Sequence, residues 1–296
     1  MEPQQQSKKE KSVPNIKALL FDLDNTLYPA SAPLNRAMHL LIIDYVAKHI
    51  LKEEGYNPED PEASRASALC DEYYGKYGLT INGLVTHYSD TVDVDHFLDY
   101  AHAPSKPAHL LTNLPKQQPS PGKQTLRDML LSLRRDNGTE ERQKLFKWIF
   151  TNSYRPHAER VLAHLGIEDC FDGIVDYLIL RLGCKPHQEA YITMLNHVNR
   201  IHAQDDKNNN NDDGGREDDE EGTAVVRIKA EECLFFDDSL SNLKTAKTVG
   251  MYTVLVGHPP AATTSDGSGL PWYVDQAIAD IQDLPSVLPF FGLACC

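Results

Sequence analysis

The chain has 296 residues, 41% of them hydrophobic, and a formal net charge of −14. This length and composition predict a globular protein with a large buried core. Nine acidic and two basic residues between positions 205 and 221 account for half of the net charge. The remaining chain is only mildly acidic, which excludes the basic stripes expected of a nucleic-acid-binding surface.

The six cysteines contain no CxxC spacing, and Cys170, Cys184 and Cys233 lie in or beside apolar segments. Reduced, buried thiols of this kind indicate a reducing compartment, so we expect the cytoplasm, with the nucleus as an addition. The N-terminal segment has no hydrophobic signal core, and no apolar run is long enough to span a bilayer, so we expect no membrane partner. Cys295 and Cys296 would allow lipidation, but the segment before them carries no basic charge and a frayed tail is favoured.

The first half of the chain is predicted to be mostly helical. Residues 1–14 are polar and predicted to be disordered, and a strand is predicted over residues 16–21. Apolar residues recur at helical spacing over residues 35–51. Further helical segments are predicted at 61–75, 80–88, 94–100 and 124–136. Because no strand pattern stands out between residues 31 and 137, we expect residues 32–140 to form an all-helical insertion.

Strand and helix patterns alternate in the second half. Strands are predicted at 146–151, 171–176, 232–237 and 251–256, and helices at 155–165, 186–198, 239–249 and 277–284. The alternation predicts an α/β fold with a parallel sheet, built from residues 15–31 and 141–296. Residues 204–222 are rich in Asn, Asp, Glu and Gly, and we expect a disordered acidic insert there, with a regulatory or metal-binding role as a minor alternative.

Polar residues of useful chemistry stand at the predicted strand ends and in one loop. They are Asp22, Asp24, Thr151, Lys185, Asp237 and Asp238. If the strands are parallel neighbours, these residues meet at the carboxyl edge of the sheet, where α/β proteins bind ligands. Four carboxylates there cannot all stay ionised unaided, and Mg²⁺ together with the Lys185 ammonium would relieve their repulsion. The set fits phosphoryl transfer, in which one carboxylate is the nucleophile and another the proton donor.

Each residue also has a purely structural interpretation. Asp22 and Asp24 could end a strand and cap a turn, and Lys185 could begin an exposed helix. Thr151 and Asn152 could form a turn before a helix cap. The acidic pair that ends a second strand, at positions 237 and 238, favours the functional interpretation.

Other polar residues receive no role at this point. Asn242 follows Asp238 by one helical turn and is either a solvent-facing residue or a neighbour of the site. Three histidines lack the spacing of zinc ligands, and we interpret them as ordinary helix residues: His157, His164 and His187.

The series Asp22-x-Asp24-x-Thr26, Thr151, Lys185-Pro186 and Phe-Phe-Asp237-Asp238 resembles, in order, the four motifs of the haloacid dehalogenase superfamily of phosphatases. The resemblance implies a Rossmannoid core with a parallel sheet and an inserted all-helical cap, of the type called C1, that closes over the site. The second carboxylate, Asp24, favours a phosphatase or a phosphomutase over a dehalogenase, which needs no acid to protonate an alkoxide.

The resemblance implies a role for each residue of the series. Asp22 would be the nucleophile that forms an aspartyl-phosphate, and Asp24 would act first as the acid and then as the base. Thr151, Asn152 and Lys185 would hold the phosphoryl group. The implied Mg²⁺ site consists of the Asp22 side chain, the Asp24 backbone carbonyl and the Asp237 side chain, with Asp238 orienting a metal-bound water or Lys185.

A narrower resemblance is to the fungal-type pyrimidine 5′-nucleotidases. It rests on Asp24-Asn-Thr-Leu-Tyr28-Pro29, Tyr77-Gly78-Leu-Thr-Ile-Asn-Gly83-Leu84, Phe150-Thr151-Asn152 and Cys184-Lys185-Pro186-His187. It implies Mg²⁺-dependent hydrolysis of UMP and CMP, with a small phosphomonoester as the partner molecule. The piece from Tyr77 to Leu84 lies in the expected cap, where substrate selection is expected.

Three alternatives remain open. The same type of enzyme could act on a sugar phosphate, a lysophospholipid or phosphoglycolate, and a phosphomutase is a less favoured variant. A non-catalytic interaction protein could use the acidic insert as its contact, although none of Asp22, Asp24, Lys185 and Asp237 has been lost. The sequence indicates no oligomeric state.

Overall fold

The structure is a computed structural model that describes residues 13–102, 111, 114, 124–135, 145–210, 227–258 and 269–295. Its strands are β1 (Ala18–Phe21), β2 (Leu133–Arg135), β3 (Phe146–Phe150), β4 (Gly173–Val175), β5 (Cys233–Asp237), β6 (Tyr252–Val256), β7 (Gln276–Ile278) and β8 (Leu293–Cys295). Its α-helices are α1 (Leu34–Tyr45), α2 (Arg65–Tyr77), α3 (Thr80–His87), α4 (Val94–Ala101), α6 (Leu126–Ser132), α7 (Arg155–Leu165), α8 (Tyr177–Leu180), α9 (Gln188–Asn210) and α10 (Leu240–Val249).

Six strands form one sheet in the order β4-β3-β1-β5-β6-β7, and every neighbouring pair in it is parallel. Side chains that alternate along a strand point to opposite faces of the sheet, and apolar clusters bury both faces here. Leu19 and Phe21 of β1 lie in one apolar cluster with α6 and α7, whereas Ala18 and Leu20 lie in another with α9 and α10. The expected α/β fold with a parallel sheet is therefore confirmed. The sheet with α6 to α10 is called the sheet layer below.

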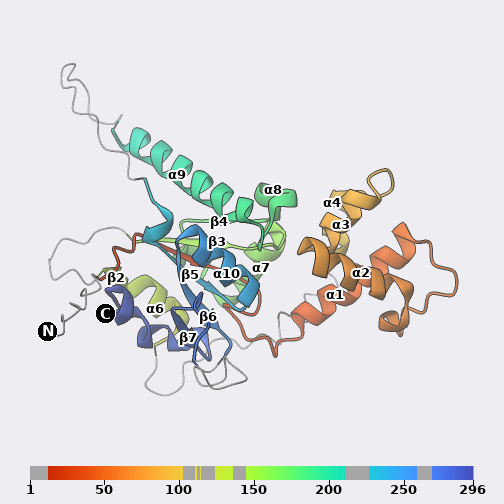
Figure 1. Ribbon diagram of the computed structural model, residues 1–296, viewed down its shortest axis with the longest axis horizontal. Helices are drawn as coiled ribbons and strands as arrows, with labels where there is room; N and C mark the ends of the chain where they lie inside the picture. Colours follow the sequence, from red (N-terminus) through yellow and green to blue (C-terminus); the bar gives the residue numbers. More distant parts are fainter. Residues whose placement is uncertain are drawn as a thin grey trace, which may run out of the picture.

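Helices α1 to α4, called the helical block below, lie beside the sheet layer (Figure 1). Most of their buried apolar residues form a third cluster, in which Tyr45 is in contact with several aromatic rings. Leu34 and Met38 at the start of α1 belong instead to the cluster of Leu19 and Phe21. A π-helical turn, Val46–Ile50, extends α1 into the third cluster. Tyr177 at the start of α8 also belongs to it, so the sheet layer contributes one buried side chain to the block.

Four expectations on local structure differ from the structure. Residues 124–135 pack with the sheet rather than with the helical block, because Leu126, Met129 and Leu130 of α6 lie in the β1 cluster. The segment is not wholly helical, since β2 pairs antiparallel with β8. Residues 204–210 continue α9, so the acidic segment begins as helix. In place of a helix at 277–284, β7 is followed by a 3₁₀ turn, Ile281–Ser286, that contains Pro285.

Several expectations fall on residues outside the described ranges. Most of the N-terminal segment 1–14 and residues 211–222 of the acidic insert lie there. The expected division into a cap at 32–140 and a core of 15–31 and 141–296 stays a prediction.

Two glycines in the helical block provide a test of how closely its helices pack. A Cβ atom at Gly83 of α3 would lie 2.3 Å from the Tyr73 ring of α2, whereas a Cβ atom at Gly75 would have no neighbour within 4 Å. Gly83→Ala should lower the free energy of unfolding by about 1–3 kcal/mol, because the ring cannot yield that much space without strain. Gly75→Ala should leave stability unchanged or raise it by up to about 1 kcal/mol through helix propensity. Urea unfolding measures both, and equal stability of the two variants would contradict the close contact.

Candidate functional site

The candidate residues meet at the carboxyl edge of the three central strands. Phe21 of β1 pairs with Ile149 of β3 and with Phe236 of β5, so these strands end side by side. Asp22 directly follows β1, and its backbone N–H donates to the Phe236 carbonyl at 2.9 Å. Thr151 follows β3 and Asp237 is the last residue of β5. Parallel pairing in register therefore brings residues far apart in the sequence to one edge.

Lys185 joins these strand ends. Its Nζ donates to Asp22 Oδ1 at 2.8 Å, to Asp237 Oδ2 at 2.9 Å and to the Phe150 carbonyl at 2.7 Å. The side chain is only 1% exposed. All three donor sites of the ammonium are used, and each goes to a different strand end. The Lys185 side chain thus ties β1, β3 and β5 together at the edge.

Asn152 holds the backbone of Lys185. Its Nδ2 donates to the Lys185 carbonyl at 2.8 Å, and its Oδ1 accepts from the Lys185 N–H at 2.9 Å. The expected role of Asn152 was to hold a phosphoryl group, but its amide is occupied by this pair of bonds. The backbone N–H of Thr151 donates to the Val175 carbonyl at 3.0 Å. The Thr151 hydroxyl accepts from the Ser153 N–H at 3.0 Å, so both polar groups of Thr151 already have partners within the protein.

The charges at this edge shift one another's pKa. Burial raises the pKa of Asp22 well above its usual value, and the neighbouring carboxylates add to this although Lys185 opposes it. Burial alone would lower the pKa of Lys185, but the charges of Asp22 and Asp237 outweigh it and raise the pKa. Lys185 therefore stays charged. Asp22, Asp237 and Asp238 together carry more negative charge than one ammonium can balance.

The two consecutive carboxylates at the end of β5 have different surroundings. Asp237 is fully buried, and its oxygens accept from Lys185, from the Ser239 N–H at 2.7 Å and from Asn242 Nδ2 at 3.0 and 3.1 Å. Asp238 accepts one bond, from Asn25 Nδ2 at 3.2 Å. Burial, together with the charge of Asp237, raises the pKa of Asp238 to about 6. Asp238 is therefore better placed than Asp237 to offer a free carboxylate oxygen.

Asp24 has a separate set of polar contacts, beside the residues that surround Lys185. Its Oδ1 accepts from the Tyr28 hydroxyl at 2.5 Å and contacts His157 Nε2 at 2.8 Å, and its Oδ2 accepts from the Ser153 hydroxyl. Burial would raise the pKa of Asp24, but the His157 charge and the bonds from His157, Ser153 and Tyr28 outweigh it and hold the pKa well below its usual value.

The sequence interpretation missed the role of two residues here. His157 was expected to be an ordinary helix residue, but it is buried and contacts Asp24. A signal was present: His157 lies in the first turn of the helix that follows β3, and such a turn begins at the same edge of the sheet as Thr151. Asn242, left open from the sequence, contacts Asp237 and is a neighbour of the site.

The donor set fits a divalent cation in charge, although among the described residues no group of three His, Cys, Asp or Glu side chains is already arranged around one point. Burial, and then repulsion from neighbouring carboxylates, raises the pKa of Asp22 and Asp238, and Lys185 offsets only part of this rise. Carboxylate oxygens with a shortage of positive charge are the ligands that Mg²⁺ prefers.

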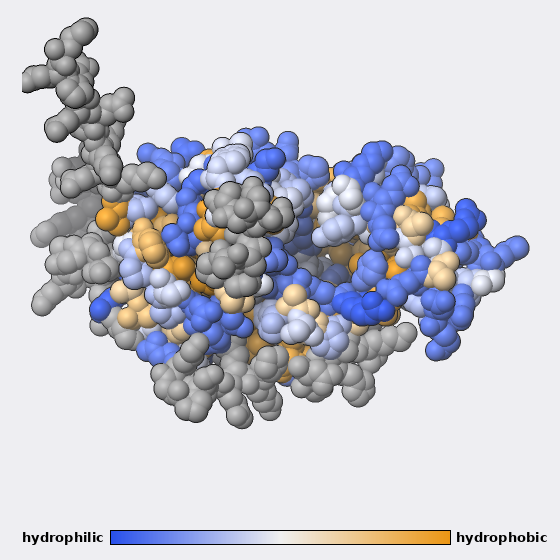
Figure 2. Space-filling view, turned by 60° about the horizontal axis from the view of Figure 1, so that its bottom comes forward, coloured by the Kyte–Doolittle hydropathy of each residue, from blue (hydrophilic) through white to orange (hydrophobic). Residues whose placement is uncertain are grey.

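A cavity of about 470 Å³ lies between the helical block and the site. Its lining includes Asn152 and Ser153 from the loop after β3, and Ser153 contacts Asp24. Apolar and aromatic side chains cover much of the rest, among them Met38, Ile42, Tyr74, Leu79, Ile81, Phe97, Leu98 and Tyr177. The space-filling view shows a hollow between the helical block and the rest of the molecule (Figure 2).

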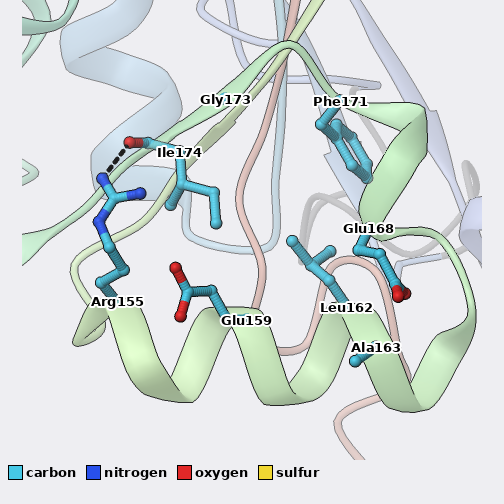
Figure 3. Close-up of a pocket in the computed structure, with 8 residues that line it drawn as sticks. All are labelled: Arg155, Glu159, Leu162, Ala163, Glu168, Phe171, Gly173 and Ile174. Atoms are coloured by element: carbon cyan, nitrogen blue, oxygen red, sulfur yellow. Dashed lines mark hydrogen bonds between the residues drawn. The ribbon is translucent and has the colours of Figure 1, made fainter.

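A second cavity, of about 390 Å³, lies between α7 and the edge strand β4 (Figure 3). Arg155 on its wall donates to the Ile174 carbonyl at 2.6 Å and pairs with Asp176. None of the candidate residues lines it. We assign it no part in the site.

Comparison with known proteins identifies the family of the chain and includes a related yeast sequence. A family profile described as haloacid dehalogenase-like hydrolase matches residues 16–250. "Phosphate metabolism protein 8" of Saccharomyces cerevisiae is 34% identical over 167 residues. That match covers 54% of this chain and 43% of the yeast protein, so the chain aligns with less than half of its relative's length.

Solved structures of similar fold are distant in sequence. A HAD phosphatase from Thermococcus onnurineus is 17% identical, with a TM-score of 0.49 over 92% of this chain and 98% of that one. The HAD-hydrolase YfnB from Bacillus subtilis, solved bound to magnesium, is 17% identical, with a TM-score of 0.44 over 93% of this chain and 99% of that one. Within the described ranges, no helix has both the length and the apolar character needed to cross a membrane.

The raised pKa of Asp238 predicts a pH dependence of stability in protein treated with a chelator. A carboxyl whose pKa is higher in the folded state than in the unfolded chain stabilises the fold at low pH, and this stabilisation is lost as pH rises toward the folded pKa of about 6. Asp238→Asn removes this loss. The difference in free energy of unfolding between Asp238→Asn and the wild type should therefore increase from pH 4 to pH 7.

Urea unfolding at several pH values measures this difference. Asp90→Asn, a change at an exposed carboxylate of the helical block, is the matched control and should keep the wild-type profile. A constant difference between Asp238→Asn and wild type across this range would contradict the electrostatic description of the edge.

Proposed function

The chain belongs to the haloacid dehalogenase-like hydrolases, and from this premise we propose that it is a Mg²⁺-dependent phosphomonoesterase acting on the pyrimidine nucleoside 5′-monophosphates UMP and CMP. The observation that carries the proposal is the buried Lys185 ammonium, bonded to Asp22 and Asp237 at the edge of the sheet. A nucleophilic carboxylate beside a fixed positive charge is what attack on a phosphate dianion requires.

The proposed reaction has two steps. Asp22 attacks phosphorus, so that an aspartyl Oδ–P bond forms while the bond from phosphorus to the sugar oxygen breaks, and Asp24 gives a proton to the leaving oxygen. Water then attacks phosphorus, Asp24 takes its proton, and the aspartyl Oδ–P bond breaks to release phosphate and regenerate Asp22. The Lys185 ammonium stabilises the negative charge on the phosphoryl oxygens in both steps.

The side chains of Asp22 and Asp238 with the backbone carbonyl of Asp24 are the proposed Mg²⁺ ligands. Asp237 is a less suitable direct ligand than Asp238, because its oxygens already accept from Lys185, Ser239 and Asn242, whereas Asp238 accepts from Asn25. We assign Asp237 the task of holding Lys185. When bound, Mg²⁺ would neutralise charge on the phosphoryl oxygens and the carboxylates.

Asp24 is suited to the base role as it stands, because its low pKa keeps it ionised. To act as the acid in the first step it must first receive a proton. His157 Nε2 lies 2.8 Å from its Oδ1, and an imidazole passes on a proton more readily than the Tyr28 and Ser153 hydroxyls that also contact Asp24. We therefore include His157 in the site as a contact of Asp24, which is both the proposed acid and the proposed base.

The cavity supports a nucleotide over smaller substrates. Its volume of about 470 Å³ lies within the range of sites that bind small organic molecules. Tyr74, Phe97 and Tyr177 on its wall offer aromatic surface for a flat base. Phosphoglycolate would leave most of this space empty. A sugar phosphate or a lysophospholipid remains the second candidate, since the cavity lining also contains aliphatic side chains.

Replacement of the proposed nucleophile tests the chemistry. Asp22→Asn should reduce phosphate release from UMP to background, because an amide cannot form the acyl phosphate. Its far-UV circular dichroism should match the wild type. Asp90→Asn, at an exposed carboxylate, should keep wild-type turnover. Retained turnover in Asp22→Asn would show that another group attacks phosphorus.

A phosphate-release assay over a panel of monophosphates tests the substrate. UMP and CMP should give kcat/KM values about tenfold or more above those of purine nucleotides, ribose 5-phosphate and phosphoglycolate. Removal of Mg²⁺ with a chelator should abolish turnover, and added Mg²⁺ should restore it. Equal kcat/KM values for UMP and sugar phosphates would favour the second candidate class of substrate and leave the proposed chemistry unchanged.

A further inference from the structure

A buried amide joins the helical block to the loop that carries Lys185. Asn82, near the start of α3, is only 3% exposed. Its Nδ2 donates to Cys184 Sγ at 3.0 Å and to the Tyr77 carbonyl at 3.3 Å, and its Oδ1 accepts from the Tyr177 hydroxyl at 3.3 Å. Cys184 and Tyr177 belong to the sheet layer. One side chain of the block is therefore bonded to two residues on the other side of the junction.

A second contact lies close by. Helix α2 ends at Gly78, which has a φ of 76°. A Cβ atom at this position would lie 3.2 Å from both the Lys185 carbonyl oxygen and Pro186 Cδ. A residue with no side chain suits both the left-handed conformation and the close approach. The helical block thus meets the Lys185 loop at two points, Gly78 and Asn82.

The wall of the cavity lies between these two points. Leu79, Thr80 and Ile81 line the 470 Å³ cavity, whereas Gly78 and Asn82 do not. Gly83, the other glycine of this segment, packs against the Tyr73 ring. The segment from Tyr77 to Leu84 was expected to select the substrate. Gly78, Asn82 and Gly83 contact neighbouring elements, and within this segment only Leu79, Thr80 and Ile81 line the cavity.

We propose that Asn82 is a positioning residue for the leaving group of the substrate. It holds the Leu79–Ile81 wall at a set distance from Asp24 and Lys185 by docking the helical block on the Cys184–Lys185 loop. The inference rests on the proposed function, because it assigns the leaving group to the cavity. Binding of a large leaving group then depends on Asn82, although Asn82 does not contact the leaving group.

The phosphoryl end of the site should not depend on Asn82. Lys185 is held by Asn152 at its backbone and by Asp22, Asp237 and the Phe150 carbonyl at its ammonium. Loss of the Asn82 amide leaves these bonds in place. It leaves Cys184 and the Tyr177 hydroxyl without their partner, and the wall beside them can then shift.

The test compares two phosphoesters that share an alkoxide leaving group but differ in size, UMP and glycerol 3-phosphate. Asn82→Ala should raise the KM for UMP about 10- to 100-fold, because a displaced wall weakens binding of the leaving group equally in the ground state and in the transition state. Its kcat for UMP, and its kcat/KM for glycerol 3-phosphate, should stay within about threefold of wild type.

Asn199→Ala is the matched control. Asn199 also forms a pair of bonds through its amide, donating to the Ile228 carbonyl at 2.9 Å and accepting from the Ile228 N–H at 2.7 Å, but it does not line the cavity. Its loss should lower stability without changing the ratio of the two kcat/KM values. If Asn82→Ala lowers both kcat/KM values equally, as a merely structural defect would, the inference is wrong.

Hydrogen exchange provides a readout that needs no turnover. In Asn82→Ala, the amides of residues 78–82 should exchange faster than in wild type, and those of β1, β3 and β5 should not change. Unchanged exchange at residues 78–82 would overturn the inference. If the wild type releases no phosphate from UMP, the proposed substrate fails; the kinetic comparison then uses the best large substrate of the panel, and the exchange result still decides the role of Asn82.

Discussion

The site depends on one buried ammonium held between carboxylates. Lys185 bonds to Asp22, to Asp237 and to the carbonyl that ends β3, so its charge is both the electrostatic centre of the edge and a link between three strands. A charge this deeply buried is stable only when it is paired, and removal of one partner from such a group typically costs about 3–5 kcal/mol. Neither the strand ends nor the Lys185 loop can therefore move independently. The same constraint that stabilises the edge holds Asp22 beside a positive charge, which is the arrangement a nucleophilic carboxylate needs.

The carboxylates of this edge fall into two groups with opposite electrostatics. Around Lys185, burial and mutual repulsion raise the pKa of Asp22 and Asp238. Beside Asp24, the charge of His157 and the hydrogen bonds from His157, Ser153 and Tyr28 lower the pKa of Asp24. Asp22 and Asp24 are two residues apart in the sequence, yet their environments push their pKa values in opposite directions. Two carboxylates separated in this way can carry out different tasks in one reaction.

Much of the sheet was predictable from the sequence, because short apolar runs that end in polar residues are characteristic of parallel strands. The meeting of Asp22 and Asp237 followed from that pattern, and Lys185 was expected to reach the same edge from a loop. The pattern could not predict which distant side chains would come into contact. His157 looked like any helical histidine, and only the fold brings it to Asp24. The three-residue strand β2 was too short for a period-of-two signal, and α6 looked like one more helix of the block although it packs on the sheet. Residues 204–210 are polar, but they extend a helix that had already begun, where nucleation is no longer needed.

The pairing of β2 with β8 has a consequence for how the protein is made. Residues 133–135 leave the ribosome long before residues 293–295 are synthesised, and in the described part of the chain β2 has no other partner strand. During translation, the backbone of β2 is therefore an open edge beside α6, of the kind that neighbouring nascent chains and chaperones can bind. This corner of the molecule closes only after residue 295 has emerged from the exit tunnel.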